Sequence, residues 1–275
     1  MATTKSLRTS SPRFCTILDV CNKFPRLVAT SINLDQSDSP IVLYDAQVDD
    51  SIFMASQRIY NALMPTYKSI TALEETAPWV GSIISNRQNT VPASRLLAAD
   101  AGTSAICEHF TLTFTSSSGY TVSGFLSGSV GSGTITSDFT STGGDLIISA
   151  SSVTGMFSGT FASGDMIFIS LNKWNRFISN IATYFALSDV LRNLAYSNAV
   201  NIDPSIFERY ANHAKADLKA LQTPYADDGY RLSTLPSRDF SDWQCGGWDG
   251  GLYDHLGTPD DNEFGDEMTD TYSSK

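Results

Sequence analysis

Apolar side chains recur at helical intervals in two separated parts of the chain. Between Asp45 and Pro65 they follow one another every three or four residues, the period of an amphipathic helix. The proline has no backbone N–H to donate and is expected to end that helix. After Asn172 the apolar face is broader than a surface helix needs, so a second helix should lie at the centre of a bundle. The core positions that we expect on these two helices are Val48, Ile52, Ile59, Trp174, Ile178, Ile181 and Phe185.

Two further helices are predicted from their caps. Thr16 followed three residues later by Asp19 is an N-cap signal for a short helix over residues 17–24. Asp203 is followed by a proline at the first helical position, which predicts a last helix. The apolar stripe of that helix includes Leu218, which we also expect in the core of the bundle.

The segment between the two helical parts has the pattern of β structure. Residues 111–170 contain 35 Ser, Thr or Gly in 60 positions and no Lys or Arg, which excludes an amphipathic helix. Phe110, Leu112 and Phe114 alternate with polar residues, as in a half-buried strand. Glycine turns every 8–12 residues indicate five or six short strands, the spacing of a small barrel or sandwich. Residues 66–101 have no clear period, and an irregular helix and a hairpin both fit them.

These patterns predict an α+β chain in which a small α-helical bundle holds an inserted all-β domain, a barrel or a sandwich, and is followed by an extended C-terminal tail. The expected parts are the N-terminal helical part of the bundle (1–103), the inserted β domain (104–172), the C-terminal helices of the bundle (173–224) and the tail (225–275).

The net charge of −11 is concentrated near the C-terminus. Residues 227–275 hold twelve acids and three bases, whereas residues 1–226 hold 17 acids and 15 bases. The chain lacks the clustered Lys and Arg that bind phosphate backbones. DNA is therefore expected only as passing, non-specific cargo, for example in a channel through which it slides.

The acidic tail keeps large aromatic side chains although it has no secondary-structure period. Such residues are usually rare in segments that do not fold alone. We interpret them as anchors that become buried when a partner binds. Packing of the tail back onto its own domain is the alternative. The expected anchors are Phe240, Trp243, Trp248, Tyr253 and Phe264.

Residues that could support chemistry are scattered. The three histidines are isolated, the four cysteines are not at metal-ligand spacing, and no nucleophile, base and oxyanion donors can be assembled. We therefore expect no catalytic residue, no cofactor and no metal. The segment Gly128–Gly133 lacks the Lys-Ser/Thr of a phosphate loop and is predicted to be a turn. Glu74 and Glu75 are expected on a solvated face, and the acids after Asp260 do not match a calcium loop.

The N-terminal sequence has no charged-then-apolar leader, and no apolar run approaches the ~18 residues of a membrane span. The expectation is a protein made in the cytoplasm, with no membrane partner and with free thiols.

The order of parts and four short stretches resemble the head-to-tail adaptor proteins, also called neck or connector proteins, of tailed bacteriophages. The resemblance spans residues 14–221. In that family a small helical bundle forms a ring under the portal, usually of twelve copies, and a β domain often lies between the helices. The stretches are FCTILDVCNKFPRL, DAQVDDSIFMASQRIYNALMPTY, TGMFSGTFASGDMIFISLN and KWNRFISNIATYFALSDVL.

The resemblance implies a non-enzymatic virion protein of the neck, made in the host cytoplasm. Its partners would be further copies of itself in a dodecameric ring, the portal protein, and a downstream neck or tail-terminator protein. The tail after Pro224 would dock on the portal. The insert is larger than usual for the family, and residues 66–101 have no counterpart in it. The resemblance assigns core roles to Val48, Ile52, Ile59, Ile178, Ile181 and Leu218.

The alternative function is a surface- or carbohydrate-binding virion module carried by the β insert. Faces of Ser and Thr with interleaved aromatic residues are compatible with sugar contact, although residues 111–170 contain no tryptophan.

Overall fold

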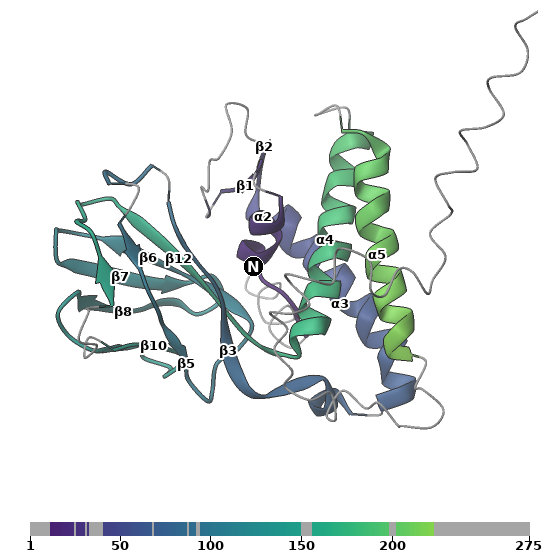
Figure 1. Ribbon diagram of the computed structural model, residues 1–275, viewed down its shortest axis with the longest axis horizontal. Helices are drawn as coiled ribbons and strands as arrows, with labels where there is room; N and C mark the ends of the chain where they lie inside the picture. Colours follow the sequence, from purple (N-terminus) through teal and green to yellow (C-terminus); the bar gives the residue numbers. More distant parts are fainter. Residues whose placement is uncertain are drawn as a thin grey trace, which may run out of the picture. The chain divides into compact units, whose positions relative to one another are not determined.

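The computed structural model describes residues 12–24, 26–30, 32, 41–67, 69–86, 88–91, 94–149, 156–197 and 202–222. The chain is α+β, and its strands β3 to β12 are inserted between helices α3 and α4 (Figure 1). It divides into two compact units, residues 1–233 and residues 234–275, and the second lies outside the described residues.

The first helix, α2 (Ile17–Lys23), begins where its cap predicts. The hydroxyl of Thr16 accepts from the backbone N–H of Asp19 at 3.2 Å, and the Asp19 carboxylate accepts from the backbone N–H of Thr16 at 2.9 Å. This reciprocal pair satisfies two backbone donors that the helix itself leaves unbonded. The predicted N-cap is confirmed, and it forms a full capping box.

Helix α3 (Asp45–Tyr67) buries its whole predicted apolar stripe. The expected end at Pro65 is wrong, because the helix continues through the proline to Tyr67. The Tyr67 hydroxyl donates to the carbonyl oxygen of Leu221 at 3.0 Å, and this contact with helix α5 (Pro204–Gln222) holds the last turn in place.

Helix α4 (Arg176–Tyr196) is the centre of the helical part. Every residue from Ile181 to Ser188 is buried, and the helix contacts α2, α3, α5 and strand β12 (Met166–Trp174). Trp174 is buried as expected, but it belongs to β12 and not to the helix. Asn175 is the N-cap, and its side chain accepts from the backbone N–H of Phe177.

The main sheet has five antiparallel strands in the order β3-β12-β6-β7-β8. Three smaller sheets have the orders β5-β10-β9, β11-β4 and β1-β2, the last being parallel. The remaining strands are β1 (Leu27–Ala29), β2 (Ile41–Leu43), β3 (Glu74–Ser85), β4 (Arg95–Leu96), β5 (Asp100–Ala101), β6 (Glu108–Phe114), β7 (Gly119–Gly124), β8 (Gly128–Thr134), β9 (Phe139–Thr140), β10 (Leu146–Ile148) and β11 (Phe157–Ser158); a short 3-10 helix, η1 (Ile70–Leu73), precedes β3.

The β part begins earlier in the chain than expected. The segment Glu74–Ser85 forms a 12-residue strand that pairs with β12, so the main sheet begins at residue 74 and the expected boundary at residue 104 is wrong. Most of this strand is half-buried on both faces, and it contains Pro78 and Gly81, so it lacks the alternation that reveals a strand. The strands predicted from alternation, such as β6 and β7, are present.

One hydrophobic core fills the β part. Alternate residues of β6, β7 and β12 point into it, and Phe139 and Leu146 enter it from the three-stranded sheet. Every sheet of the described strands has two ends in its strand order, so these strands do not form a closed barrel.

The segment Gly128–Gly133 is not the turn that we expected but part of edge strand β8. Its glycines leave room for aromatic rings. A Cβ on Gly133 would lie 2.7 Å from the hydroxyl oxygen of Tyr120, and one on Gly131 would lie 3.1 Å from the Phe139 ring. The glycines are therefore explained by strand positions at which a side chain would clash with a neighbouring ring, and no phosphate loop is needed to account for them.

Candidate functional site

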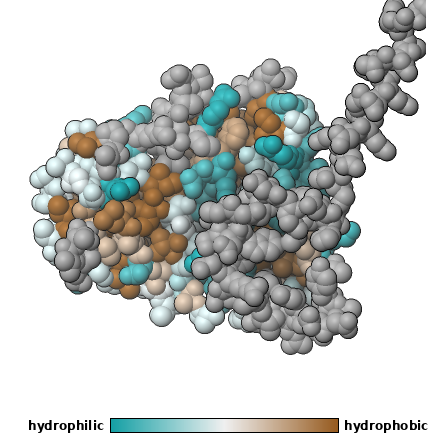
Figure 2. All heavy atoms as spheres, in the orientation of Figure 1, coloured by the Kyte–Doolittle hydropathy of each residue, from teal (hydrophilic) through white to brown (hydrophobic). Residues whose placement is uncertain are grey.

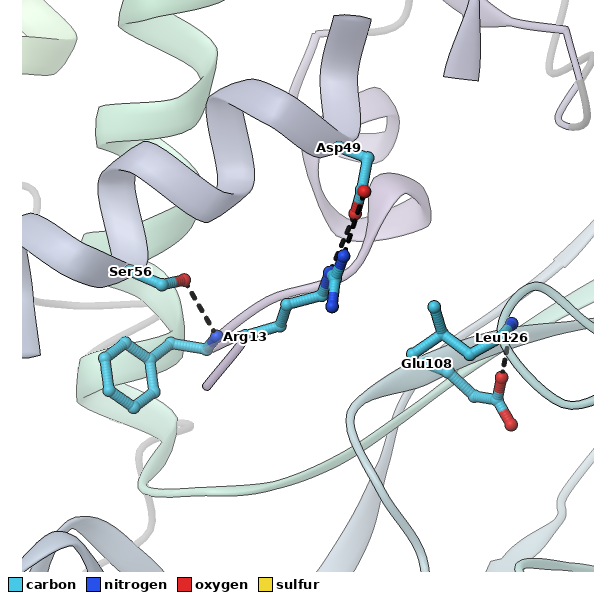
Figure 3. Close-up of polar contacts among 6 residues, drawn as sticks. Arg13, Asp49, Ser56, Glu108 and Leu126 are labelled. Atoms are coloured by element: carbon cyan, nitrogen blue, oxygen red, sulfur yellow. Dashed lines mark hydrogen bonds and ion pairs between the residues drawn. The ribbon is translucent and has the colours of Figure 1, made fainter. Parts of the chain in front are cut away.

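The residues preceding α2 connect the helices to the main sheet. The backbone N–H of Phe14 donates to the hydroxyl of Ser56 on α3 at 3.1 Å (Figure 3). Its carbonyl accepts from the side-chain amide of Asn172 on β12 at 3.0 Å. One buried residue therefore bonds to a helix on one side and to the sheet on the other.

Both the amide nitrogen and the oxygen of the Asn172 side chain form hydrogen bonds here. Besides Phe14, its amide donates to the hydroxyl of Ser179 on α4 at 2.9 Å, and its oxygen accepts from the backbone N–H of Trp174 at 2.9 Å. The Phe14 ring meets the Trp174 ring edge-on, with centroids 4.9 Å apart. We call Phe14, Ser56, Asn172, Trp174 and Ser179 the joint.

A buried ion pair lies beside the joint. The Arg13 guanidinium binds the Asp49 carboxylate of α3 through two nitrogens, at 2.8 and 3.0 Å (Figure 3). The two side chains are 6% and 5% exposed. Such a bidentate ion pair fixes the orientation of the N-terminal segment on α3.

Glu74 and Glu75, which we expected on a solvated face, are partly exposed and lie at the start of β3, where each has a hydrogen-bond partner. The carboxylate of Glu74 accepts from the Lys173 ammonium at 2.7 Å, and that of Glu75 accepts from the backbone N–H of Arg176 at 3.1 Å. Together they tie the end of β12 and the first turn of α4 to β3. This role is structural.

Glu108 is a second buried carboxylate with a structural role. It accepts from the backbone N–H of Leu126 at 2.8 Å (Figure 3). It also accepts from the backbone N–H of Ser127 at 3.1 Å and from the Ser127 hydroxyl. These bonds hold the turn between β7 and β8. A Cβ on Gly124 would lie 2.9 Å from both carboxylate oxygens, so glycine is required there.

Burial shifts the pKa values of one histidine and two cysteines of this region toward their neutral forms. His109 stacks on the Phe125 ring at 5.0 Å, and burial lowers its pKa to about 4, opposed by the Asp49 charge. Burial raises the pKa of the Cys15 thiol and raises that of Cys21 to about 12, so both thiols are protonated at neutral pH. His213, on α5, also has a lowered pKa, first because of burial.

The described residues bring no reactive set together. No group of three or more His, Cys, Asp or Glu in the described ranges could hold a metal ion. The side chains of Ser56, Asn172 and Ser179 each bond to another part of the fold, whereas the buried indole N–H of Trp174 has no hydrogen-bond partner among the described residues. These hydrogen bonds fix the position of the helices relative to the main sheet.

The predicted sites fall into two groups. The eight bundle-core positions, Leu218 included, are all buried in the structure. The five anchors Phe240, Trp243, Trp248, Tyr253 and Phe264 lie outside the described residues, as do His255 and Cys245.

Sequence patterns did not reveal the apolar side chains that the fold leaves exposed. Figure 2 shows apolar residues on the visible face of the molecule, some of them over the strands. Exposure depends on tertiary packing, and no local signal distinguishes these positions from core residues. Those most exposed are Val42 (66%), Tyr44 (73%), Met54 (58%), Leu97 (46%), Ile106 (42%) and Tyr196 (75%).

None of the helices in the described ranges is long and apolar enough to cross a bilayer. Comparisons with known proteins identify no family: no family model and no curated protein matches the chain. Two crystal structures of FlgL from Xanthomonas campestris, in space groups H3 and C2, align with 55% of this chain at 16% and 18% identity. The alignments span 53% and 52% of those chains, about half their length, and both have a TM-score of 0.26, which carries no argument about fold or function.

Proposed function

We propose that the chain is a structural subunit of a phage virion, a head-to-tail connector that forms a ring under the portal. The ring, a dodecamer, extends the DNA channel and joins the portal to the next neck or tail-terminator protein. The subunit works by presenting surfaces and carries out no reaction. DNA is a passing, non-specific cargo.

The observation that carries this proposal is the position of the β part in the bundle. The strands β3 to β12 leave the bundle after α3 and return to it at α4, the central helix. The connector family, as the resemblance describes it, has a β domain between the helices of a small bundle. The sequence resemblance covers the same elements, from Phe14 to Leu221.

The joint supports a structural role for the subunit. Asn172 links the N-terminal segment, the sheet and α4 through hydrogen bonds that are buried from water. Buried polar groups with all partners present give a unique relative arrangement of the elements that they connect. A ring subunit needs this property, because its lateral contacts are repeated around the ring and each buries on the order of 1,200–2,000 Å².

The acidic tail is the proposed contact with the portal, through Phe240, Trp243, Trp248, Tyr253 and Phe264. Aromatic anchors on several tails of one ring would bind together, and linked weak contacts give far higher avidity than one contact alone. The test is co-purification of the cognate portal protein with the full chain and with a chain ending at Pro224. We expect the truncated chain to remain folded and to lose the portal. Portal binding at full occupancy without the tail would overturn this role.

A second candidate function, surface or carbohydrate binding by the β part, is supported by one specific surface. Thr121 and Ser123 on β7 pair with Ser132 and Ser129 on β8, and all four side chains are exposed on one face. The core shared by the two larger sheets favours a sandwich for this part. Glycan-array binding by the full chain that is lost when these four residues become alanine would favour this function.

A further inference from the structure

Two arginine side chains on the surface of the helical part share one carboxylate. Arg58 of α3 lies 3.2 Å from one oxygen of Asp189 on α4, and Arg192, one turn later on α4, lies 3.8 Å from the other oxygen. The two arginine side chains are 45% and 38% exposed. Because one carboxylate offsets only one of the two charges, the cluster keeps a surplus positive charge, and each guanidinium keeps N–H donors that the carboxylate does not use.

Buried aromatic rings hold both guanidinium groups in place. The Arg58 guanidinium lies 4.8 Å from the centre of the Phe185 ring, and that of Arg192 lies 5.7 Å from the centre of the Phe207 ring. A guanidinium that is already held by a ring and a carboxylate loses little conformational entropy when it binds a further acceptor. The cluster is therefore preorganised to bind one more carboxylate or phosphate.

Large apolar side chains extend this surface. Met54, one turn before Arg58 on α3, and Tyr196, one turn after Arg192 on α4, are among the most exposed apolar residues described. Arginine, tyrosine and methionine are enriched in protein interfaces, whereas a phosphate backbone is bound by clustered Lys and Arg whose charges are not offset. The surface therefore fits a protein partner that carries a carboxylate. We call Met54, Arg58, Asp189, Arg192 and Tyr196 the arginine face.

Helix α5 carries a carboxylate of the required kind. Asp217 is half-buried, and no ion pair joins it to another of the described residues. Burial raises its pKa to about 6, so a cation placed beside it would offset a cost that a fully solvated acid does not have. Tyr210 and His213 lie on the same face of α5, seven and four residues earlier. We call Tyr210, His213 and Asp217 the aspartate face.

The two faces lie on different flanks of α5, which packs against both α3 and α4 (Figure 1). The rings of the aspartate face approach the Tyr184 ring, and the Lys23 ammonium of α2 lies 5.5 Å from the centre of that same ring. The aspartate face is therefore on the α2 side of α5. The arginine face is on the α3 side, since Arg58 belongs to α3. A head-to-tail contact requires two such different surfaces on one molecule.

We propose that the arginine face of one copy binds the aspartate face of the next copy, with Arg58 and Arg192 placed around Asp217. This inference rests on the proposed ring and names its lateral contact. Each pair of bound copies still has one unused face of each kind, so the same contact repeats until the ring closes.

This inference and the connector function fail separately. A ring that forms on the portal through other surfaces would remove the inference and leave the connector function. Association through these two faces in a chain that binds no portal would leave the inference and remove the connector function.

The experiment exchanges the charges of the two faces in the full chain. One variant carries Arg58→Glu and Arg192→Glu, and the other carries Asp217→Arg. Each variant alone places like charges across the contact, so its self-association, measured by sedimentation velocity, should be weaker than that of wild type by about tenfold or more. An equal mixture of the two variants places opposite charges at every contact, in alternating order, and should associate as wild type does.

The matched controls change the same kinds of charge elsewhere. Arg95→Glu and Asp100→Arg, at exposed positions of β4 and β5, should leave the self-association unchanged.

A second measurement does not depend on charge reversal. A chain with Arg192→Cys is mixed with a chain with Asp217→Cys, both also carrying Cys245→Ser, and a short bismaleimide joins accessible thiols. The native thiols of Cys15, Cys21 and Cys107 are buried. Mass spectrometry should find positions 192 and 217 of different chains crosslinked. A chain with Arg95→Cys in place of Arg192→Cys should give no such product.

Four results would overturn the proposal: self-association that the charge variants leave unchanged, a mixture of folded variants that does not recover it, no crosslink between positions 192 and 217, or a chain that stays monomeric at millimolar concentration. Binding of a short DNA duplex by wild type that is lost in the Arg58→Glu, Arg192→Glu variant, without any self-association, would assign the two arginines to phosphate and would also overturn it.

Discussion

The side-chain amide of Asn172 and the carbonyl of Phe14 lie 3.0 Å apart, although the two residues are 158 positions apart in the chain. This bond closes the N-terminal segment onto the strand that leads into the central helix. Because the same amide also binds Ser179, a single side chain links three elements. This residue, which is 1% exposed, is therefore one of those that set the relative arrangement of helices and sheet.

Replacement of Asn172 by alanine is expected to destabilise the protein by about 2–4 kcal/mol, since it leaves the Phe14 carbonyl and the Trp174 N–H buried without their partner. Urea unfolding followed by circular dichroism measures this change. Thr121→Ala, on the exposed face of β7, is the control and should change the free energy of unfolding by less than about 0.5 kcal/mol. Equal effects of the two variants would show that the joint does not hold the fold.

The Arg13–Asp49 pair should respond differently to single and double replacement. Asp49→Ala removes an ion-pair partner of a buried guanidinium and should cost about 3–5 kcal/mol. The double variant Arg13→Met, Asp49→Leu replaces both charges by apolar groups of similar size and should be nearly neutral. Thermal unfolding of the three proteins gives the comparison. A double variant as unstable as the single one would mean that the pair contributes more than mutual charge compensation.

Acid should destabilise the fold through His109. Its pKa is about 4 in the folded protein against 6.5 for the free side chain. Between these values the unfolded chain binds more protons, so stability is complete above pH 6.5 and falls as the pH drops toward 4, by about 3 kcal/mol for this group. Asp217 works in the opposite direction, because burial raises its pKa to about 6.

The contribution of His109 is therefore measured as the difference in acid-induced loss of stability between wild type and a variant without the histidine. Urea unfolding of wild type and His109→Gln at pH 7 and pH 4.5 should show a smaller acid loss in the variant. Since Asp217 is common to both proteins, its contribution cancels. An identical pH dependence in the two proteins would contradict the burial of a neutral histidine.

The hydroxyl of Tyr120 gives a prediction of increased stability. The residue is 1% exposed, and its oxygen has no hydrogen-bond partner within the described part of the chain. Tyr120→Phe removes a buried polar group without partners and should raise the free energy of unfolding by about 1 kcal/mol. Tyr120→Ala, the control for packing, should lower it by about 3–5 kcal/mol. A loss of stability in the phenylalanine variant would reveal a partner for the hydroxyl.

Local signals in the sequence predicted the elements whose determinants are local. The Thr16–Asp19 cap fixed the start of α2, and the alternation of Phe110, Leu112 and Phe114 identified β6. Strand β3 escaped prediction because its half-buried positions give no period of two. Pro65 failed to end α3 because a tertiary bond from Tyr67 holds the last turn.

The candidate site was less predictable than the fold. The joint is built from Phe14, Asn172 and Ser179, whose partners are set by distant parts of the chain, and such pairings leave no mark in a single sequence. The exposure of Val42 and Tyr44 is likewise a property of packing. The aromatic anchors were identified from composition alone, and their role stays a prediction.

The most direct test of the connector account is cryo-electron microscopy of the full chain bound to its cognate portal protein. The account predicts a closed ring of subunits on the portal, with the indole rings of Trp243 and Trp248 buried against portal side chains. A complex without a ring, or tails whose indoles stay solvated or remain on their own subunit while the portal is bound, would contradict it.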